Sequence, residues 1–155
     1  MVIEMVPVGF VAAPRARAED DYWGGEQATI SLVDPFTAEA LRGLDEFSHV
    51  EVSYFFHGVE PAQVVTGARH PRNNCEWPRV GIFAQRARGR PNRLGSTICR
   101  LLRVEAKSLV VAELDAIDGT PVLDIKPVMQ EFLPRGALRQ PQWSHELMRH
   151  YWQAR

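Results

Sequence analysis

The sequence predicts a mainly β protein, a small single-domain β-barrel with a short helix after the second strand and a C-terminal helix. Three observations carry this prediction. The chain has 155 residues, 45% of them hydrophobic and 24% charged, which suits one globular domain with its own core. Short segments rich in β-branched and aromatic residues recur along it and are separated by turn residues. The sequence has no G-x-G-x-x-G after a strand and no Walker sequence, so neither a doubly wound nucleotide-binding domain nor a P-loop enzyme is indicated.

The first two strands are predicted at residues 6–11 and 28–33, where apolar residues alternate with others. Asp34 then has the character of a helix N-cap, and Pro35 suits the first helical position. Apolar residues follow at helical spacing. We therefore expect a short amphipathic helix that ends near residue 45.

Residues 50–56 predict a buried strand that delivers His57 and Gly58 to its C-terminal edge. Across residues 57–78, prolines, glycines and asparagines interrupt any regular spacing of apolar residues that would predict a helix or a strand. A connection of this length in a compact domain is usually functional or mobile. We expect it to be a flap or a loop that contacts a partner.

The second half of the chain predicts a further set of strands and a final helix. Ser144 is expected to cap a C-terminal helix whose apolar stripe favours packing on the barrel or on a second subunit over ligand binding. Residues 1–130 are expected to form the barrel, and residues 131–155 a helical extension of the same domain. The strands are predicted at residues 80–84, 97–104, 109–114 and 122–125, with residues 105–108 as a hairpin turn.

The charges are unevenly distributed along the chain. The formal net charge of −1 excludes a uniformly basic nucleic-acid binder. Residues 12–46 hold eight acids and three arginines, whereas residues 77–104 hold seven arginines and no acid. A guanidinium suits forked contacts with phosphate or carboxylate, so the group predicts a ligand-facing patch, although each arginine has even odds of pairing with an acid or lying solvated. The seven are Arg79, Arg86, Arg88, Arg90, Arg93, Arg100 and Arg103.

Cysteine and histidine usage predicts neither disulfides nor a metal site. Cys75 and Cys99 are the two cysteines, and no Cys or His pair has zinc-like spacing. This usage suits a reducing compartment. The N-terminus lacks the basic start of a signal peptide, and no apolar run approaches the roughly 20 residues that span a bilayer. We expect a cytoplasmic protein without membrane contact.

Two polar motifs predict the functional site. The first, Arg90-Pro91-Asn92, fixes a backbone turn, because proline locks its own φ and pushes the preceding residue into an extended conformation. The second, residues 118–127, opens with a turn and continues as a strand in which an acid and a lysine alternate with apolar residues. Taken alone, each motif fits a structural turn or an exposed ion pair equally well. Pairing of the strands between them would bring both to one end of a sheet.

These motifs resemble those of a known family, the TsaA/TrmO-like (YaeB-like) S-adenosylmethionine-dependent methyltransferases. The resemblance covers roughly residues 6–128. It implies a compact β-barrel that works as a homodimer with the cofactor near the subunit contact. It also implies methylation of the exocyclic amine of threonylcarbamoyl-adenosine next to the anticodon of tRNA. The matching segments are residues 41–49, 54–57, 80–86, 90–92 and 118–127.

The resemblance also implies roles for particular residues. As catalytic groups, Arg86 would hold the cofactor, Asn92 with Arg90 would shape the acceptor side, and Asp118 or His57 would receive the amine proton. The RNA-binding residues would be Arg88, Arg90 and Arg93. Cofactor contacts would fall on His57, Gly58, Arg86, Ser96, Asp118, Gly119, Thr120 and Pro121.

The chain departs from the family pattern in four places, two of which are Arg93-Leu94 where the family has Pro-Ile and Val128 where it has Tyr. The early Pro-Arg-Gln segment is absent, and residues 21–25 read Asp-Tyr-Trp-Gly-Gly, which leaves open whether Trp23 substitutes by stacking. The C-terminal domain of longer members is replaced by a short helix. Two alternatives therefore stay open: a methyltransferase with a small-molecule or other RNA acceptor, and a barrel that binds S-adenosylmethionine or RNA without catalysing transfer.

Overall fold

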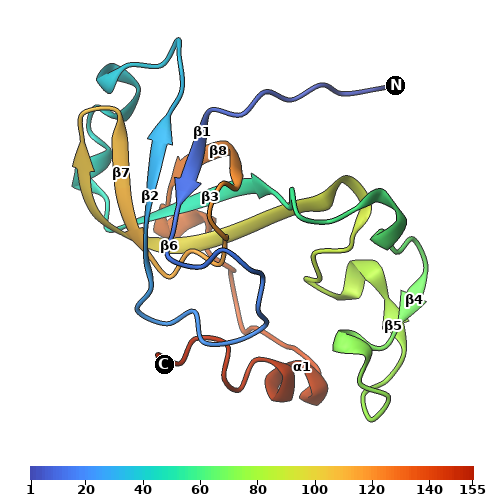
Figure 1. The fold of residues 1–155 in the computed structure, drawn as a ribbon. Coiled ribbons are helices and arrows are strands. Elements are labelled where there is room, and N and C mark those ends of the chain that lie inside the picture. Colours follow the sequence, from blue (N-terminus) through green and yellow to red (C-terminus); the bar gives the residue numbers. More distant parts are fainter.

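The computed structural model describes residues 1–155 and contains a closed six-stranded barrel (Figure 1). Neighbouring strands pair antiparallel all the way around it. The prediction of a mainly β barrel with few short helices is confirmed. In barrel order the strands are β1 (Gly9–Ala12), β2 (Gln27–Leu32), β7 (Ser108–Ala112), β6 (Leu94–Glu105), β3 (His49–Phe55) and β8 (Pro121–Pro127).

Alternation of side chains along the strands builds the core. In β3 every second residue is buried, so Val50, Val52 and Tyr54 point inward while their neighbours face outward. Removing apolar side chains from water in this way is the main favourable contribution to folding. The core cluster comprises Val11, Ala28, Ile30, Leu32, Leu41, Val50, Val52, Tyr54, Cys99, Leu109, Val111, Leu114, Ala116 and Val122.

Strand β3 lies between β6 and β8, and its register with each of them determines which segments meet at one end of the barrel. Ser53 of β3 faces Ser96 of β6 on one side and Asp124 of β8 on the other. Because both pairings are antiparallel, the end of β3 lies beside the beginnings of β6 and β8. We call this the site end. The predicted juxtaposition of the two polar motifs is therefore confirmed.

The prediction of a barrel strand at residues 80–84 is wrong. Val80–Gly81 form β5, which pairs only with β4 (Ala68–Arg69) in a separate two-stranded sheet, to the right of the barrel in Figure 1. The side chain of Gln85 donates to the carbonyls of Arg69 and Val80 and so closes the chain into a local turn. The long connection after β3 holds further short 3₁₀ turns, at Pro61–Gln63, Pro71–Asn73 and Ile82–Ala84.

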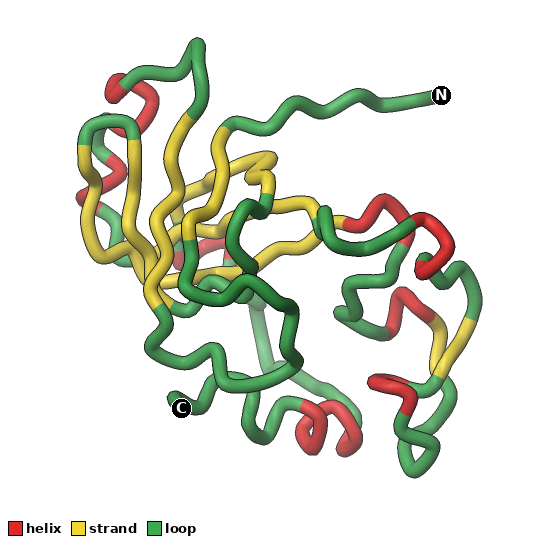
Figure 2. The backbone as a smooth tube through the Cα atoms, in the orientation of Figure 1, coloured by secondary structure: helices red, strands yellow, loops and turns green.

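The helix predicted after β2 is a pair of 3₁₀ turns, Ala38–Leu41 and Leu44–Glu46, rather than an amphipathic α-helix (Figure 2). Gly43 separates them with a φ of 80°, a left-handed conformation that ends a helix. The expected cap is also different. Thr37 accepts from the amide of Glu39, while the Asp34 carboxylate accepts from Lys107 Nζ at 2.8 Å.

The C-terminal helix α1 (Gln142–Leu147) is present, but its N-cap is Pro141 and not Ser144. After it the chain runs beside residues 22–24. The amides of Tyr22 and Trp23 donate to the carbonyls of His150 and Tyr151, at 3.1 and 2.8 Å. The C-terminal segment is thus tied by backbone hydrogen bonds to the loop between β1 and β2. None of the helices has the length and apolarity that crossing a membrane requires.

This contact generates a prediction for Gly24. A Cβ at this position would lie 2.1 Å from the carbonyl oxygen of Trp152, and a backbone atom cannot swing aside. We expect Gly24→Ala to lower the free energy of unfolding by about 1–3 kcal/mol through overpacking, as measured by urea denaturation. Gly67→Ala is the matched control, because a Cβ there meets nothing within 4 Å. Equal stability of the two variants would contradict the docking of the C-terminal segment.

Candidate functional site

The site end brings together segments that are far apart in the sequence. His57 and Gly58 directly follow β3, and the turn at residues 118–120 directly precedes β8. A Cβ on Gly119 would lie 3.9 Å from His57 Nε2, and one on Gly58 would lie 4.0 Å from Ile117 Cδ1. Two predicted cofactor-binding segments therefore lie next to each other.

The turn before β8 is held by hydrogen bonds to the chain around the end of β1. The Asp118 carboxylate accepts from the amide of Ala13 through Oδ1 at 3.0 Å, and the Asp118 amide donates to the Arg15 carbonyl at 2.8 Å. Thr120 is buried, and its hydroxyl donates to the Ile117 carbonyl at 2.7 Å. Asp118 itself is exposed, and its second carboxylate oxygen has no protein partner. That oxygen is available to a ligand.

Arg86 and Ser96 also meet at this end. Arg86 Nη2 donates to the Ser96 carbonyl at 2.5 Å, and Ser96 Oγ donates to Glu51 Oε1 at 2.7 Å. The arginine side chain is exposed and keeps further N–H donors free for an anionic group. Arg86 lies in the long connection between β3 and β6, residues 56–93, which we call the excursion. Its hydrogen bond fixes it to the start of β6.

A polar groove of about 450 Å³ runs over the outside of β3, between β6 and β8. Its volume is in the range of small-molecule sites. Glu51 and Asp124 supply carboxylates, and Lys126, which forms an ion pair with Asp124, supplies an ammonium. Two acids beside one cation suit a ligand with both an amine and a carboxylate. The groove is lined by Met5, Glu51, Ser53, Leu94, Gly95, Ser96, Leu123, Asp124 and Lys126.

The residues predicted to contact RNA occupy different environments. Arg90 Nη1 donates to the Gln85 carbonyl at 2.7 Å, and Arg93 Nη1 donates to the Val59 carbonyl at 2.6 Å. Both are half-buried and help to fix the fold of the excursion. Arg88 is exposed, with one long contact of 3.5 Å to the Ala18 carbonyl.

Asn92, predicted to shape the acceptor side, is exposed and adopts a φ of 62° within the turn before β6.

The seven arginines of residues 77–104 do not form one patch. Arg100 and Arg103 form ion pairs with Glu113 and Glu105. Arg100 lies opposite His49, at the other end of β3, roughly 20 Å along the strand from the site end at about 3.3 Å per residue. The cationic group at the site end is therefore smaller than the sequence suggests.

A buried carboxylate network was missed by the sequence analysis. Asp115 accepts hydrogen bonds from the hydroxyls of Tyr54, at 2.8 Å, and of Thr97 and Tyr151. Burial, with the Asp115 charge second, raises the pKa of Tyr54 well above its usual value. Tyr54 and Thr97 are polar residues at inward-facing positions of strands, which is the one signal that could have indicated this network.

The same network connects the C-terminal segment to the barrel. Burial first, and then Asp115, raise the pKa of Tyr151, whereas the positive charges of Arg86 and Arg72 act in the opposite direction. Tyr151 and Tyr54 donate to the same carboxylate, so the C-terminal segment is tied to the end of β3.

Trp23, whose stacking on a cofactor the sequence leaves open, is enclosed by the protein. It is 3% exposed, and the guanidinium of Arg15 lies 3.7 Å from the centre of its ring. Arg15 also donates to the Glu26 carboxylate and to the carbonyls of Asp21 and Tyr22. The indole thus stacks on Arg15 and organises the loop, while Tyr22 is the exposed aromatic residue of this segment.

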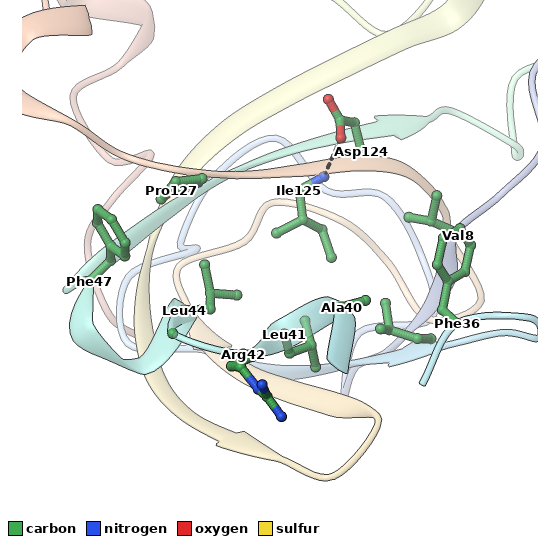
Figure 3. A pocket seen from close by; sticks show the side chains of 12 residues that line it. Val8, Phe36, Ala40, Leu41, Arg42, Leu44, Phe47, Asp124, Ile125 and Pro127 are labelled. Atoms are coloured by element: carbon green, nitrogen blue, oxygen red, sulfur yellow. Dashed lines mark hydrogen bonds between the residues drawn. The ribbon is translucent and has the colours of Figure 1, made fainter. Parts of the chain in front are cut away.

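A second cavity, of about 350 Å³, is apolar and contains none of the predicted site residues (Figure 3). It lies between the two 3₁₀ turns after β2 and the outer part of β8, where Ile125 points toward Leu41 and Leu44. Asp124 turns away and accepts from the amide of Ile125. This cavity extends the core. The structure has no cluster of three or more His, Cys, Asp or Glu side chains able to hold a metal ion.

The sequence matches the model of one family. Residues 13–132 match the family described as the tRNA-methyltransferase O N-terminal domain, and the chain belongs to it. The family resemblance inferred from the motifs is confirmed.

Similar proteins include methyltransferases and a binding protein. The chain is 32% identical over 143 residues to a probable S-adenosyl-L-methionine-binding protein of Pyrococcus abyssi, covering 86% of this chain and 72% of that one. It is 41% identical over 102 residues to RcsF of Pseudomonas aeruginosa, a putative S-adenosylmethionine-dependent methyltransferase, covering 65% and 44%. It is 36% identical over 105 residues to the tRNA (adenine(37)-N6)-methyltransferase of Escherichia coli, covering 64% and 44%.

The fold is also similar to that of a solved structure. A crystal structure of TrmO from Pseudomonas aeruginosa aligns with a TM-score of 0.75 at 29% identity, covering 92% of this chain and 62% of that one. The chain spans less than half the length of RcsF and of the Escherichia coli enzyme.

The Asp115 network generates a prediction for stability. In Asp115→Asn an amide donor would face hydroxyl groups that now donate to a carboxylate, leaving buried polar groups unpaired. We expect the free energy of unfolding to fall by about 1–3 kcal/mol. The control is Asp45→Asn, the same change at an exposed side chain, which should stay within about 0.5 kcal/mol of the wild type. Comparable losses in both variants, measured by urea denaturation, would show that the network contributes nothing.

Proposed function

We propose that the chain is an S-adenosylmethionine-dependent methyltransferase that acts on the exocyclic amine of threonylcarbamoyl-adenosine next to the anticodon of tRNA. The observation that carries this proposal is the meeting of three segments at the site end. His57 and Gly58 lie next to the turn at residues 118–120, and Arg86 donates to the Ser96 carbonyl at the start of β6. Membership of the tRNA-methyltransferase O N-terminal domain family supports the reaction type.

The chemistry of the site suits this cofactor. S-adenosylmethionine has a sulfonium and an ammonium, which carboxylates attract, and a carboxylate, which a lysine or arginine attracts. Glu51 and Asp124 supply the first, and Lys126 or Arg86 the second, around a groove of suitable volume. The exposed turn at Asp118 and Gly119 has the polar groups to bind a ribose hydroxyl or an adenine edge.

The residues of the chain would act mainly by alignment. The bound cofactor supplies a methyl group already activated by its positive sulfur, so the protein has to position the acceptor amine and exclude water. The amine must lose a proton as it is methylated. The free oxygen of Asp118, or His57 beside it, is placed to accept that proton directly or through water. Asn92, with Arg88, Arg90 and Arg93, would contact the acceptor side.

We also infer that the protein works as a homodimer in the cytoplasm, where tRNA is found. Apolar side chains on the outside of β6 support association, since Leu94 and Ile98 are 41% and 48% exposed. Phe83, in the excursion after β3, is 78% exposed. A second copy covering these side chains would bury them.

The dimer can be tested by light scattering after size-exclusion chromatography. We expect the mass of two chains for the wild type, and of one chain for Ile98→Glu, because a buried charge without a partner would oppose association. Thr29→Glu is a control on another barrel strand, where the residue is already half-exposed. A wild type with the mass of one chain at micromolar concentration would contradict the inference.

A second candidate function is binding of S-adenosylmethionine without methyl transfer. It is favoured by the Pyrococcus abyssi relative, which is named for binding alone and of which the chain covers 72%. A methyltransferase with another RNA or small-molecule acceptor is a third, favoured by the altered loop at residues 21–25. Comparing turnover on tRNA with and without the threonylcarbamoyl group separates the first candidate from the third.

Arg86→Ala tests the cofactor assignment. Loss of a charge-assisted hydrogen bond of about 1.5–3 kcal/mol should weaken S-adenosylmethionine binding roughly 10- to 100-fold in calorimetry. Incorporation of labelled methyl into tRNA should fall with it. Arg103→Ala removes the same charge far from the site end and should leave both measurements unchanged. If Arg86→Ala binds and transfers as well as the wild type, the assignment of Arg86 is wrong.

A further inference from the structure

Most arginines of this protein already have partners within the chain. Arg86, Arg90 and Arg93 donate to backbone carbonyls at 2.5 to 2.7 Å. An arginine held in an ion pair has to give up its carboxylate before it can bind a phosphate. Ion pairs occupy Arg15, Arg42, Arg72, Arg100, Arg103 and Arg155.

The C-terminal segment, residues 133–155, holds arginines that are free. It contains four arginines and a single acid. The acid, Glu146, accepts from the indole of Trp77 at 2.9 Å, and Arg155 is paired with Glu19. The other three arginines are exposed, and their side chains make neither an ion pair nor a hydrogen bond. They are Arg135, Arg139 and Arg149.

This cationic segment is tied to the barrel. Tyr151 donates to Asp115, which also accepts from Tyr54 at the end of β3, so the segment is connected to the site end. Figure 1 shows α1 and the C-terminus beneath the barrel, alongside the loop between β1 and β2.

Exposed aromatic side chains accompany the arginines. Trp152 is 45% exposed, and Tyr22, 39% exposed, stacks on His150 with ring centres 6.1 Å apart. Exposed rings that can stack on bases, beside arginines that bind phosphates, are the combination that proteins use to bind unpaired RNA. The surface therefore fits RNA better than an acidic protein, which would gain little from the rings.

We propose that the C-terminal segment is an RNA-binding arm in which Arg135, Arg139 and Arg149 contact phosphates. This inference rests on the proposed function, because it assigns the surface that holds the RNA while its modified adenosine is at the site end. With a net charge of −1 for the whole chain, attraction to RNA has to come from a local group of cations such as this one.

The test compares two triple variants that lose the same charge. The first is Arg135→Ala, Arg139→Ala, Arg149→Ala. The matched control is Arg42→Ala, Arg100→Ala, Arg103→Ala, whose arginines are exposed but paired with acids. Binding of a fluorescent, unmodified tRNA transcript is followed by anisotropy from 50 to 300 mM salt.

The arm variant should bind at least about tenfold more weakly at 100 mM salt. Its plot of log affinity against log salt should be shallower by about 2–3, since each phosphate contact contributes roughly 0.7–0.9 to the slope. The control variant should keep the slope of the wild type. Equal losses in the two variants would overturn the proposal, because they would reflect total charge rather than the arm.

Two further outcomes separate this proposal from the proposed function. If the arm variant shows the predicted decrease in slope but the wild type transfers no methyl group, the RNA-binding arm is supported and the proposed methyltransferase activity is wrong. If the wild type transfers a methyl group but the slope of the arm variant is unchanged, the activity is supported and the RNA-binding arm is wrong. Binding of phosphatidylserine vesicles through these arginines, without binding of the transcript, would also overturn the proposal.

Discussion

The pairing of β3 with both β6 and β8 is the constraint on which the rest of this structure depends. It makes the end of one strand and the beginnings of two others meet at a single rim. A shift of one residue in either pairing would turn the inward side chains of β3 outward, so the buried valines and Tyr54 fix the register. This register positions the polar turns that precede β6 and β8, and hydrogen bonds within and around each turn fix its conformation.

Two strongly polar features are kept in place by this apolar frame. The carboxylate of Asp115 is surrounded by three hydroxyl groups, and the guanidinium of Arg15 is held between an indole and a carboxylate. Each would be costly to bury without those partners. The partners of Asp115 come from segments distant in sequence, so its network connects β3, β6 and the C-terminal segment, whereas the partners of Arg15 lie in its own loop between β1 and β2.

The barrel strands could be predicted because they depend on local patterns: alternation and β-branched composition gave segments that overlap all six of them. The meeting of the two motifs was expected from the hairpin between them, but in the structure it results from the pairing of β3 with both β6 and β8. The part of the excursion at residues 80–84 could not be predicted in the same way. Val80 and Ile82 alternate as they would in a barrel strand, but Val80 pairs with Arg69 of β4, and the Gln85 side chain ties this turn together through the carbonyls of both residues. The glycine at position 43 similarly outweighs the helical spacing around it.

Long-range partners also explain what the sequence did not reveal about the site. Nothing near Asp115 in the sequence indicates that Tyr151 will reach it, and nothing near Arg90 or Arg93 indicates a nearby carbonyl. The surplus of arginine in residues 77–104 was correctly counted, but counting does not distinguish a guanidinium held by the fold from one free to bind a ligand.

The docking of the last residues has a consequence for where this domain ends. Residues 13–132 define the family segment, yet the backbone of residues 150–153 completes the hydrogen bonding of residues 22–24. A shortened protein that stopped at residue 132 would leave the amides of Tyr22 and Trp23 without these carbonyl partners and deprive Asp115 of the Tyr151 hydroxyl. The hydrogen-bonded structural unit is therefore longer than the segment that defines the family.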